Sequence, residues 1–380
     1  MTKFHDEPFD EVTLTKLELF RHYIRAWLHI FLSRWKRSGL APSQINIFDF
    51  FAGRGKDAKG QAGSALIVVQ ELRKYCEQHW DQKTDAPVLI ALNDVEEANI
   101  NNLKHHVEES ACPKECCHRE YTQLPFQDAF NHYLPLVQSS DSANLLIMDQ
   151  FGFKEVTPGT IATLATCGMT DILFFVSSSF IHRFCRTREI QERFQIDPRE
   201  MKSIEYKFIH KYMCKYFQGE LHGINYYLVP FSLKKGSNIY GVIFGTRHVK
   251  GLEEFLSACW KLDRYAGEAN FNIYDDLSWG GQQALWPEGN VPKKVDLFRK
   301  EVESFVREQS PDNKVLYLFC LKHGFPGKKA KEIVSEMVKD GCVEVEPLNP
   351  EDTARKSALY LSYNAYKEAP RVRYRMRDSK

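Results

Sequence analysis

Short apolar segments alternate with amphipathic ones through the first half of the chain, and this alternation restricts the fold more than any other feature. The apolar segments predict strands at 46–51, 88–93, 144–149 and 171–176. The segments between them predict helices, two of which run over 64–80 and 96–109. Strands that alternate with helices are typical of βαβ units, which build a parallel sheet with helices on its faces. We therefore expect a doubly wound α/β fold.

The alternation ends in two further strand-like runs, 226–233 and 239–246, joined by the polar segment 234–238. This pattern predicts an antiparallel hairpin. Rossmann-type sheets of the class I methyltransferase kind end in such a hairpin, with the last strand antiparallel. The expected fold is therefore class I methyltransferase-like, with a C-terminal antiparallel hairpin.

An amphipathic helix is predicted near the N-terminus. Phe20, Trp27 and Phe31 recur at helical spacing, and charged residues that include Lys16 and Arg21 fill the other positions. Such a helix lays its apolar stripe on a core and exposes its charged face. We expect Lys16 on the charged face.

The C-terminal part predicts two helices followed by two strands, an order that resembles a winged helix. The helices are expected at 315–321 and 328–339, and the strands at 342–345 and 359–363. The expected parts are an N-terminal helix at 1–40, a methyltransferase-like domain at 41–250, a helical connector at 251–309, a winged-helix-like domain at 310–365 and a basic tail at 366–380.

Composition excludes several classes of protein. The chain is 43% hydrophobic and 27% charged, as an ordinary globular protein is, and its net charge of +1 requires any nucleic-acid surface to come from local clustering. The longest apolar run, 172–176, is far shorter than the ~20 residues of a membrane span. The acidic start of the chain does not resemble a signal peptide. Ten scattered cysteines fit a reducing compartment, so we expect a cytoplasmic protein.

A glycine-containing turn follows the first predicted strand and is the sharpest local motif. The run holds Asp49, Ala52, Gly53 and Gly55, and glycines there let the backbone approach a ligand closely. It resembles the first motif of S-adenosylmethionine (SAM) dependent methyltransferases, especially those that act on nucleic acids. The resemblance implies that Ala52, Gly53 and Gly55 face the methionine part of the cofactor and that Asp49 orders the turn. The alternative is a plain tight turn.

Asp94 directly follows the second predicted strand. Nucleotide-binding folds place an acidic residue there to accept hydrogen bonds from ribose hydroxyls. The alternative is an acid that stabilises the N-terminus of the following helix through its dipole. A third strand near 119–122 would bring Thr122 or Gln123 close to the adenine ring.

The fourth strand ends in Asp149-Gln150-Phe151-Gly152. Amino-group methyltransferases carry Asp/Asn-Pro-Pro-aromatic at this point, where the carboxylate or amide accepts from the target amine and the ring stacks on the base. The resemblance implies catalytic roles for Asp149 and Phe151. Gln150 and Phe151 stand where that motif has its prolines, and Gly152 stands where it has the aromatic. The alternative is a strand-end acid followed by a turn.

Taken together, these motifs resemble the three-Cys-motif partner protein family (TcmP) over about residues 14–250. The resemblance includes Trp27 in the first helix, the segment 50–55, Gly63-Ser64, the segment 149–152 and the serines at 177–179. These bacterial proteins carry a methyltransferase-like domain and are encoded beside a radical-SAM-like protein with a three-cysteine motif. The family usually has Asp-Pro-Phe-Gly at 149–152. The resemblance implies a three-Cys-motif protein as the partner.

Two basic clusters are candidates for nucleic-acid binding. The first interleaves aromatic residues with Arg183, Arg186 and Arg188, and the second lies on the expected recognition helix with Lys328, Lys329 and Lys331. Cations can follow a phosphate backbone while rings stack on bases. The alternatives are solvated helix faces and, for the winged helix, a protein-docking role.

A cysteine-rich loop holds Cys112, Cys116, Cys117 and His118. Structural zinc sites commonly use two CxxC pairs at a characteristic spacing. This loop contains no CxxC, and no second cysteine pair lies at that spacing from it. The prediction is no metal and a reduced loop, although metal binding by these four residues is left open.

The combined expectation is a SAM-dependent methyltransferase-like protein that acts on or binds nucleic acid and works with a three-Cys-motif partner. The alternative is a catalytically inactive scaffold of the same fold. The sequence leaves open whether the chain is an enzyme, which polymer it recognises and how it oligomerises.

Overall fold

The computed structural model describes residues 7–33, 41–112, 115–150, 152–276, 292–349 and 358–377. Its centre is a seven-stranded sheet of order β3-β2-β1-β4-β5-β7-β6, in which β7 runs antiparallel to both of its neighbours. This order confirms the class I methyltransferase-like fold. The strands are β1 (Gln44–Asp49), β2 (Val88–Asn93), β3 (His118–Thr122), β4 (Ser142–Met148), β5 (Met169–Val176), β6 (Tyr227–Lys235) and β7 (Asn238–Thr246).

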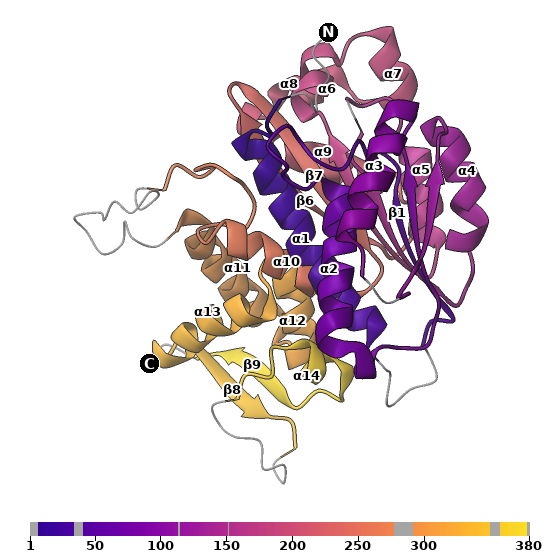
Figure 1. The fold of residues 1–380 in the computed structure, drawn as a ribbon. Helices are drawn as coiled ribbons and strands as arrows, with labels where there is room; N and C mark the ends of the chain where they lie inside the picture. The colour runs from indigo at the N-terminus through magenta and orange to yellow at the C-terminus, as the bar shows by residue number, and fades with distance from the viewer. Residues whose placement is uncertain are drawn as a thin grey trace. The chain divides into compact units, whose positions relative to one another are not determined.

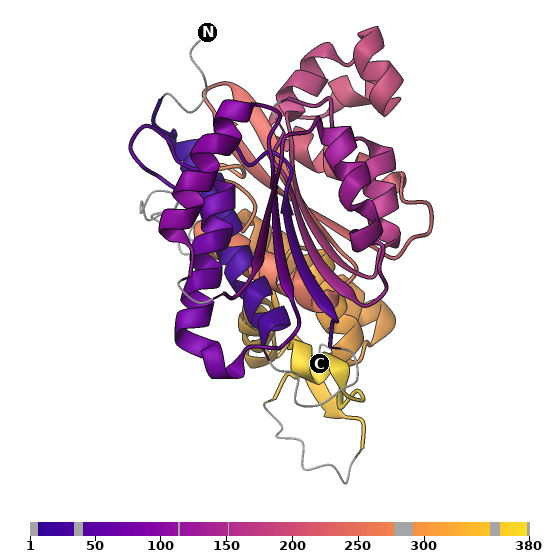
Figure 2. The same cartoon turned by 45° about the vertical axis from the view of Figure 1, so that its right-hand side comes forward.

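Helices cover both faces of this sheet (Figures 1 and 2). One face carries α1 (Glu11–Leu32), α2 (Ser64–His79) and α3 (Glu97–Ser110), and the other carries α4 (Phe126–Val137), α5 (Pro158–Thr166) and α9 (Ile209–Gly219). Side chains alternate along β1, so Phe48 packs in the cluster under α4 and α5 while Ile47 is buried on the opposite face. Three short helices follow β5: α6 (Ser178–Phe184), α7 (Arg188–Phe194) and α8 (Pro198–Ser203). The 3-10 turns are η1 (Trp80–Gln82) and η2 (Tyr206–Phe208).

Strand register brings three acidic residues to one edge of the sheet. Asp49 pairs with Leu92 of β2 and with Ile147 of β4. Because these strands are parallel, their carboxyl ends meet at the same edge, where ligands of open α/β sheets bind. Asp94 and Asp149 each lie one residue beyond the end of a strand and therefore lie near Asp49.

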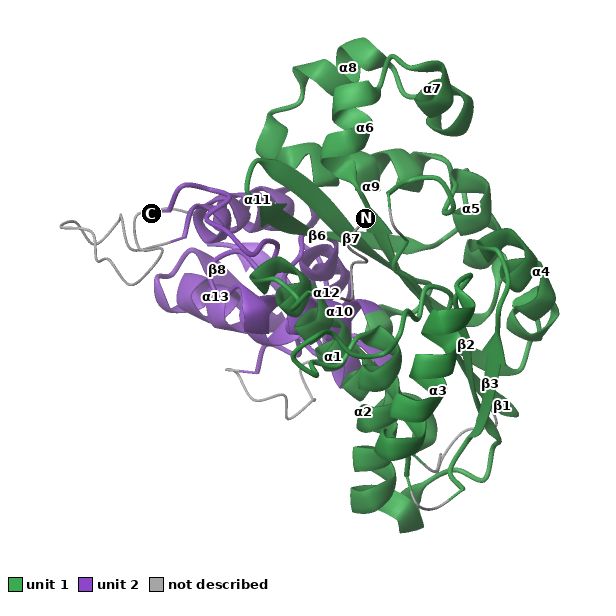
Figure 3. Cartoon of the chain, turned by 45° about the horizontal axis from the view of Figure 1, so that its top comes forward, with its two compact units in different colours: residues 1–251 green, residues 252–380 purple. Residues whose placement is uncertain are grey.

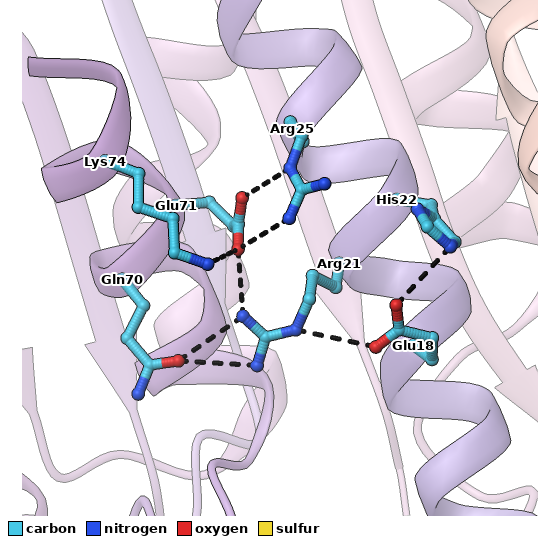
Figure 4. Close-up of polar contacts among 7 residues, drawn as sticks. All are labelled: Glu18, Arg21, His22, Arg25, Gln70, Glu71 and Lys74. Atoms are coloured by element: carbon cyan, nitrogen blue, oxygen red, sulfur yellow. Dashed lines mark hydrogen bonds and ion pairs between the residues drawn. The ribbon is translucent and has the colours of Figure 1, made fainter. Parts of the chain in front are cut away.

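The first helix is tied to the sheet and to α2 by buried polar contacts. The Tyr23 hydroxyl donates to Asp171 Oδ2 at 2.6 Å, and both side chains are buried. Figure 4 shows how the Glu71 carboxylate of α2 gathers Arg21, Arg25 and Lys74 at 2.9, 2.8 and 3.0 Å. The Glu71 side chain is only 1% exposed, so these cations balance a carboxylate that burial alone would neutralise.

The turn between β6 and β7 is shorter than expected. The strands extend to Lys235 and from Asn238, so two residues connect them in place of the five expected. Gly236 has a φ of +57°, which a two-residue hairpin turn requires of its first central position. Lys234, Lys235 and Asn238, which were expected in the loop, instead pair within the strands. An edge strand can accommodate the lysines because it exposes them to solvent.

The chain divides into two compact units, residues 1–251 and 252–380 (Figure 3). The second unit contains most of α10 (Val249–Leu262), then α11 (Lys293–Gln309), α12 (Asn313–Lys322), α13 (Gly327–Lys339) and α14 (Tyr363–Lys367), with a two-stranded sheet of β8 (Val343–Pro347) and β9 (Val372–Met376). None of the helices in the described ranges is long and apolar enough to cross a membrane.

The C-terminal strand differs from the one expected at 359–363. Helix α14 begins at Tyr363, and the partner of β8 is β9, inside the segment expected to be a basic tail at 366–380. Val372 and Tyr374 of β9 are buried, while Arg373 and Arg375 are exposed. Buried and exposed residues therefore alternate in β9, as in an ordinary half-buried strand. Its exposed arginines led to the prediction of a basic tail.

Candidate functional site

The glycine turn after β1 is fastened to the end of β2. Ala52 N donates to Asn93 O at 2.9 Å, and Gly53 N donates to Asp94 Oδ2 at 3.0 Å. Gly53 and Gly55 have φ values of +59° and +92°, which side chains strongly disfavour. The turn therefore lies beside Asp94, as the motif interpretation expects.

Asp94 organises two backbone segments at once. Its Oδ2 accepts from Gly53 N, and its Oδ1 accepts from Glu96 N at 2.9 Å and from Asn99 Nδ2 at 3.0 Å. A carboxylate has about four acceptor sites, so one site on Oδ2 remains for a ligand hydroxyl. Asp94 also accepts a hydrogen bond from Glu96 N at the start of α3, as the alternative interpretation of an acid at the helix N-terminus predicts.

Gly55 is required by packing as well as by backbone conformation. A Cβ on Gly55 would lie 3.0 Å from Leu103 Cδ1 and 3.4 Å from Leu66 Cδ1. Gly63 N donates to Gly55 O at 2.8 Å, directly before α2 begins. The turn is therefore held against α2 and α3 in a single conformation.

Asp49 is a buried carboxyl with one unused oxygen. Its Oδ1 accepts from Phe51 N at 3.2 Å, whereas Oδ2 is buried and has no hydrogen-bond partner among the described residues. Burial raises the pKa of Asp49 to about 7, a rise that the Ser64 hydroxyl and Phe51 N–H oppose and the charges of Asp149 and Asp94 reinforce. A cationic ligand group above this edge would satisfy the oxygen and favour its ionised form.

A pocket of about 330 Å³ opens at the carboxyl ends of β4 and β5. Asp149 lines it together with residues of the N-terminal segment and the hairpin: Asp10, Thr13, Lys16, Phe175, Lys235 and Tyr240. The Lys16 ammonium donates to Asp149 Oδ2 and lies 5.2 Å from the centre of the Phe175 ring. The structure therefore places a protein cation where the target amine is expected to bind Asp149.

Lys16 corrects the helix prediction. It is only 9% exposed and lies on the buried side of α1, not on the charged face. A signal for this exists in the sequence, because Lys16 stands four residues before Phe20 of the apolar stripe and so shares its face. This spacing does not identify the residue that Lys16 contacts, because Asp149 follows a strand that is distant in the sequence.

Gln150 fixes the turn after β4 through hydrogen bonds of its side chain. Its Oε1 accepts from Glu155 N and Val156 N at 2.9 and 3.2 Å, and its Nε2 donates to Phe175 O at 3.1 Å. The side chain thus fixes the segment after β4 to the end of β5. Phe151, predicted to hold a base, lies outside the described residues.

An aromatic series leads from the pocket to the surface of α6. Gly152 lines the pocket, the Phe153 ring stacks on Phe180 at 4.8 Å, and Phe180 contacts Phe184 at 4.5 Å. Phe180 and Phe184 are each 38% exposed. Rings that are exposed to this degree offer π-faces to a ligand.

The first basic cluster lies in the same segment of the chain as these rings. Arg183, Arg186 and Arg188 are all exposed. Arg183 Nη2 donates to Asn238 Oδ1 at 3.2 Å, and Arg188 pairs with Glu192 at 2.6 Å. The predicted cluster is therefore exposed, and the charge of Arg188 is balanced by Glu192 of the same helix.

The second basic cluster lies on α13 in the second unit. Lys328 and Lys331 are exposed, whereas Lys329 pairs with Glu332 at 2.9 Å and lies 5.4 Å from the centre of the Trp260 ring. Lys329 is half-buried by these contacts, so Lys328 and Lys331 are the more accessible cations of the three.

No protein-family model matches the chain, and no curated protein matches it. Among solved structures, the chain is similar to Trm1 from Pyrococcus horikoshii, solved with S-adenosyl-L-methionine, at 12% identity and a TM-score of 0.38, over 67% of this chain and 61% of that one. It is also similar to a SAM-dependent methyltransferase from Agrobacterium tumefaciens, at 7% identity and a TM-score of 0.35, over 63% of both chains. Magnesium protoporphyrin IX methyltransferase from Synechocystis PCC 6803, solved with bound SAH, matches at 9% identity and a TM-score of 0.33, over 64% of this chain and 90% of that one. The chain thus spans less than two thirds of the first two proteins, and these similarities concern the fold alone.

Proposed function

We propose that the chain binds S-adenosylmethionine at the carboxyl edge of the sheet and transfers its methyl group to an amine of a nucleic acid. The observation that carries this proposal is the convergence of three carboxyls, Asp49, Asp94 and Asp149, around the glycine turn. Asp49 has a buried oxygen without a partner, and Asp94 has an acceptor site left beside Gly53. A cofactor with a sulfonium, an ammonium and ribose hydroxyls fits this donor and charge requirement.

The residues of the chain would position the reacting groups. The cofactor supplies an activated methyl group, so orientation provides much of the rate acceleration. Asp94 would hold the ribose, Gly53 and Gly55 would keep the backbone clear of the methionine part, and Asp149 would accept from the target amine. The exposed rings of Phe180 and Phe184 would stack on bases, a contact worth about 1–3 kcal/mol per base.

The same proposal includes a three-Cys-motif protein as the partner. The resemblance to the TcmP family over the first unit supports this part. Coexpression of the two proteins with an affinity tag on this chain tests it, and a 1:1 complex that survives gel filtration is the expected result. Elution of the two proteins as separate peaks would contradict the partner assignment without affecting the cofactor site.

Two measurements test the central claim. Calorimetric titration of the full chain with SAM should give saturable binding with one site per chain. Incubation with methyl-labelled SAM and, separately, DNA, RNA or the partner protein should place label in a nucleic acid. Absence of binding rejects the cofactor site, whereas binding without any transfer rejects only the enzymatic part.

The contact between Lys16 and Asp149 favours a second candidate, a scaffold of the same fold without activity. An ammonium that already occupies Asp149 leaves less capacity for a substrate amine. In this candidate the chain binds its partner or nucleic acid and transfers no methyl group.

Removal of Lys16 separates the two candidates. If Asp149 binds the target amine, Lys16→Met removes a competing cation and lowers the KM for the acceptor roughly tenfold, as expected for a hydrogen bond between charged groups. Lys235→Met is the matched control, because Lys235 lines the same pocket but pairs with Asp10. Steady-state kinetics with a labelled acceptor measures the effect. An unchanged KM in Lys16→Met contradicts a substrate-binding role for Asp149.

Asp49 gives the proposed binding a pH dependence. Its pKa in the folded protein is raised to about 7 from an ordinary 3.8, so the folded protein holds a proton that the unfolded chain has lost between these values. The free energy of unfolding therefore falls as pH rises from 3.8 to about 7. A cationic ligand favours the ionised form, so affinity for SAM should rise as pH rises through about 7.

Calorimetric titrations at a series of pH values check this expectation. Asp49→Asn should remove the rise in affinity with pH, because an amide does not titrate. Asp128→Asn, an exposed acid in the first turn of α4, should retain it. A wild-type affinity that is constant across this range would show that Asp49 does not sense the ligand.

A further inference from the structure

Three cysteine side chains meet, with a fourth cysteine beside them, at the amino-terminal end of β3, on the edge of the sheet away from the proposed cofactor site. Cys76 lies on α2, Cys112 follows α3, and Cys116 and Cys117 directly precede β3. The Sγ atoms of Cys76, Cys112 and Cys116 all lie within 4.8 Å of one another. The sequence alone does not associate Cys76 with this loop, because their contact depends on how the strand and helix between them pack in the folded chain.

From this geometry we infer a structural zinc site, with Cys76, Cys112 and Cys116 as three thiolate ligands and Cys117 as the fourth. Tetrahedral zinc with bonds of about 2.3 Å places its sulfur ligands about 3.8 Å apart. The three sulfur atoms therefore need to move together by less than about 1 Å to bind one ion. Cys117 directly follows Cys116 in the chain, and the two thiols interact, so Cys117 is the candidate for the fourth ligand.

The chemistry of the surroundings fits a zinc thiolate centre. Cys76 and Cys116 are buried, and Cys112 and Cys117 are half-buried. Cys112, Cys116 and Cys117 line a pocket whose charged residues are two cations, Lys83 and Arg119, and three acids, Asp85, Glu108 and Glu115. Each coordinating thiol releases its proton to solvent on binding.

Other occupants of the cluster fit less well. A disulfide joins only two sulfur atoms and leaves the others unused, and all ten cysteines of the chain are without a disulfide in this structure. A [4Fe–4S] cluster binds each thiolate to a different iron, which needs sulfur atoms farther apart than the 4.8 Å seen here. A single ion with a preference for thiolates is thus the best match, and tetrahedral S₄ coordination is typical of zinc.

The inferred ion would have a structural role. It would connect α2, the end of α3 and the start of β3, which is an edge strand of the sheet. A closed site with four protein ligands has no open position for a substrate. The inference is independent of the proposed methyl transfer, since the site lies at the opposite ends of the strands.

Metal analysis of the full-length protein tests the inference. Protein produced in zinc-supplemented medium and freed of loose metal by gel filtration should retain about one Zn per chain. Cys76→Ser and Cys112→Ser should each reduce this content at least fivefold. Their matched controls are Cys167→Ser, another buried thiol, and Cys342→Ser, another half-buried thiol, and both should keep the metal.

The fourth ligand and the role of folding are tested separately. Cys117→Ser should lower zinc affinity, whereas His118→Ala should not, because His118 is 73% exposed and pairs with Glu120. If a cysteine variant fails to fold, Co²⁺ substitution of the wild-type protein decides the matter. Tetrahedral thiolate coordination gives an intense sulfur-to-cobalt charge-transfer band, and zinc should displace it.

Four results would overturn the inference. They are zinc content unchanged in Cys76→Ser and Cys112→Ser, a wild-type Co²⁺ complex without the charge-transfer band, a disulfide among these cysteines in wild-type protein purified from zinc-supplemented medium, and iron with inorganic sulfide in place of zinc. Removal of zinc by a chelator should also lower the melting temperature of the wild-type protein, because an ion that binds only the folded state stabilises it.

Discussion

Asp94→Ala should lower the affinity of the chain for SAM at least about 100-fold. The Asp94 carboxylate accepts from Gly53 N at 3.0 Å and from Glu96 N at 2.9 Å, so its loss releases the glycine turn as well as the proposed ribose contact. A hydrogen bond to a charged group contributes about 1.5–3 kcal/mol, and two such losses correspond to 100-fold or more. Calorimetric titration of variant and wild type measures the change.

Two controls separate a ligand contact from a helix cap. Glu97→Ala removes an exposed carboxylate from the first turn of α3 and should leave the affinity within about twofold of wild type. Asp94→Asn keeps one oxygen for the backbone donors but loses the charge and should show an intermediate loss. If Asp94→Ala folds normally and binds SAM as wild type does, Asp94 acts only at the start of α3.

Glu71→Gln should destabilise the first unit by about 3 kcal/mol, because removal of one partner from a buried ion pair leaves the remaining charges without compensation. The Glu71 side chain is 1% exposed and contacts three cations, of which Arg25 and Lys74 are about half exposed and can regain water. This partial exposure places the expected loss at the lower end of the range for buried pairs. Urea unfolding monitored by circular dichroism measures it.

The control for Glu71 lies on the same helix. Glu77→Gln breaks an exposed pair with Arg73 and should leave the urea midpoint close to that of the wild type. A similar loss in both variants would show that the burial of Glu71 has no energetic consequence.

Acid unfolding gives an independent check of the Glu71 network. Burial would raise the pKa of Glu71, but the hydrogen bonds from Arg25, Lys74 and Arg21 outweigh it and hold the pKa at about 2. The stabilisation is therefore complete above the ordinary pKa of 4.5 and is lost as pH falls through about 2. Glu71→Gln should remove this part of the acid dependence.

The central strands β1, β2 and β4 were predictable because each is buried on both faces. The run Val88–Asn93 is buried throughout, and its bounds match the expected ones. A strand covered by helices on both sides must be apolar at successive positions, which leaves a local signal in the sequence. The glycine turn was predictable for a similar reason, since the φ of Gly53 and Gly55 is a property of those residues themselves.

Contacts between distant segments were not predictable. Lys16 pairs with Asp149, and Cys76 joins Cys112 and Cys116, only because the fold brings α1 to the end of β4 and α2 to the start of β3. In the sequence alone, Lys16 fits an ordinary surface lysine and Cys76 fits an ordinary buried thiol. Charge in β9 similarly concealed a strand, because two arginines facing solvent outweighed Val372 and Tyr374 in the composition of the segment.

By itself, the sequence determined the class of fold and indicated the edge of the sheet at which we propose that a ligand binds. These follow from the period of the apolar residues and from glycines with special dihedral angles, both of which act within a few residues. Only the tertiary structure decided which charges and thiols meet. Their partners come from elements far apart in the chain, and interactions between side chains act over a few ångströms of space whatever their separation in sequence.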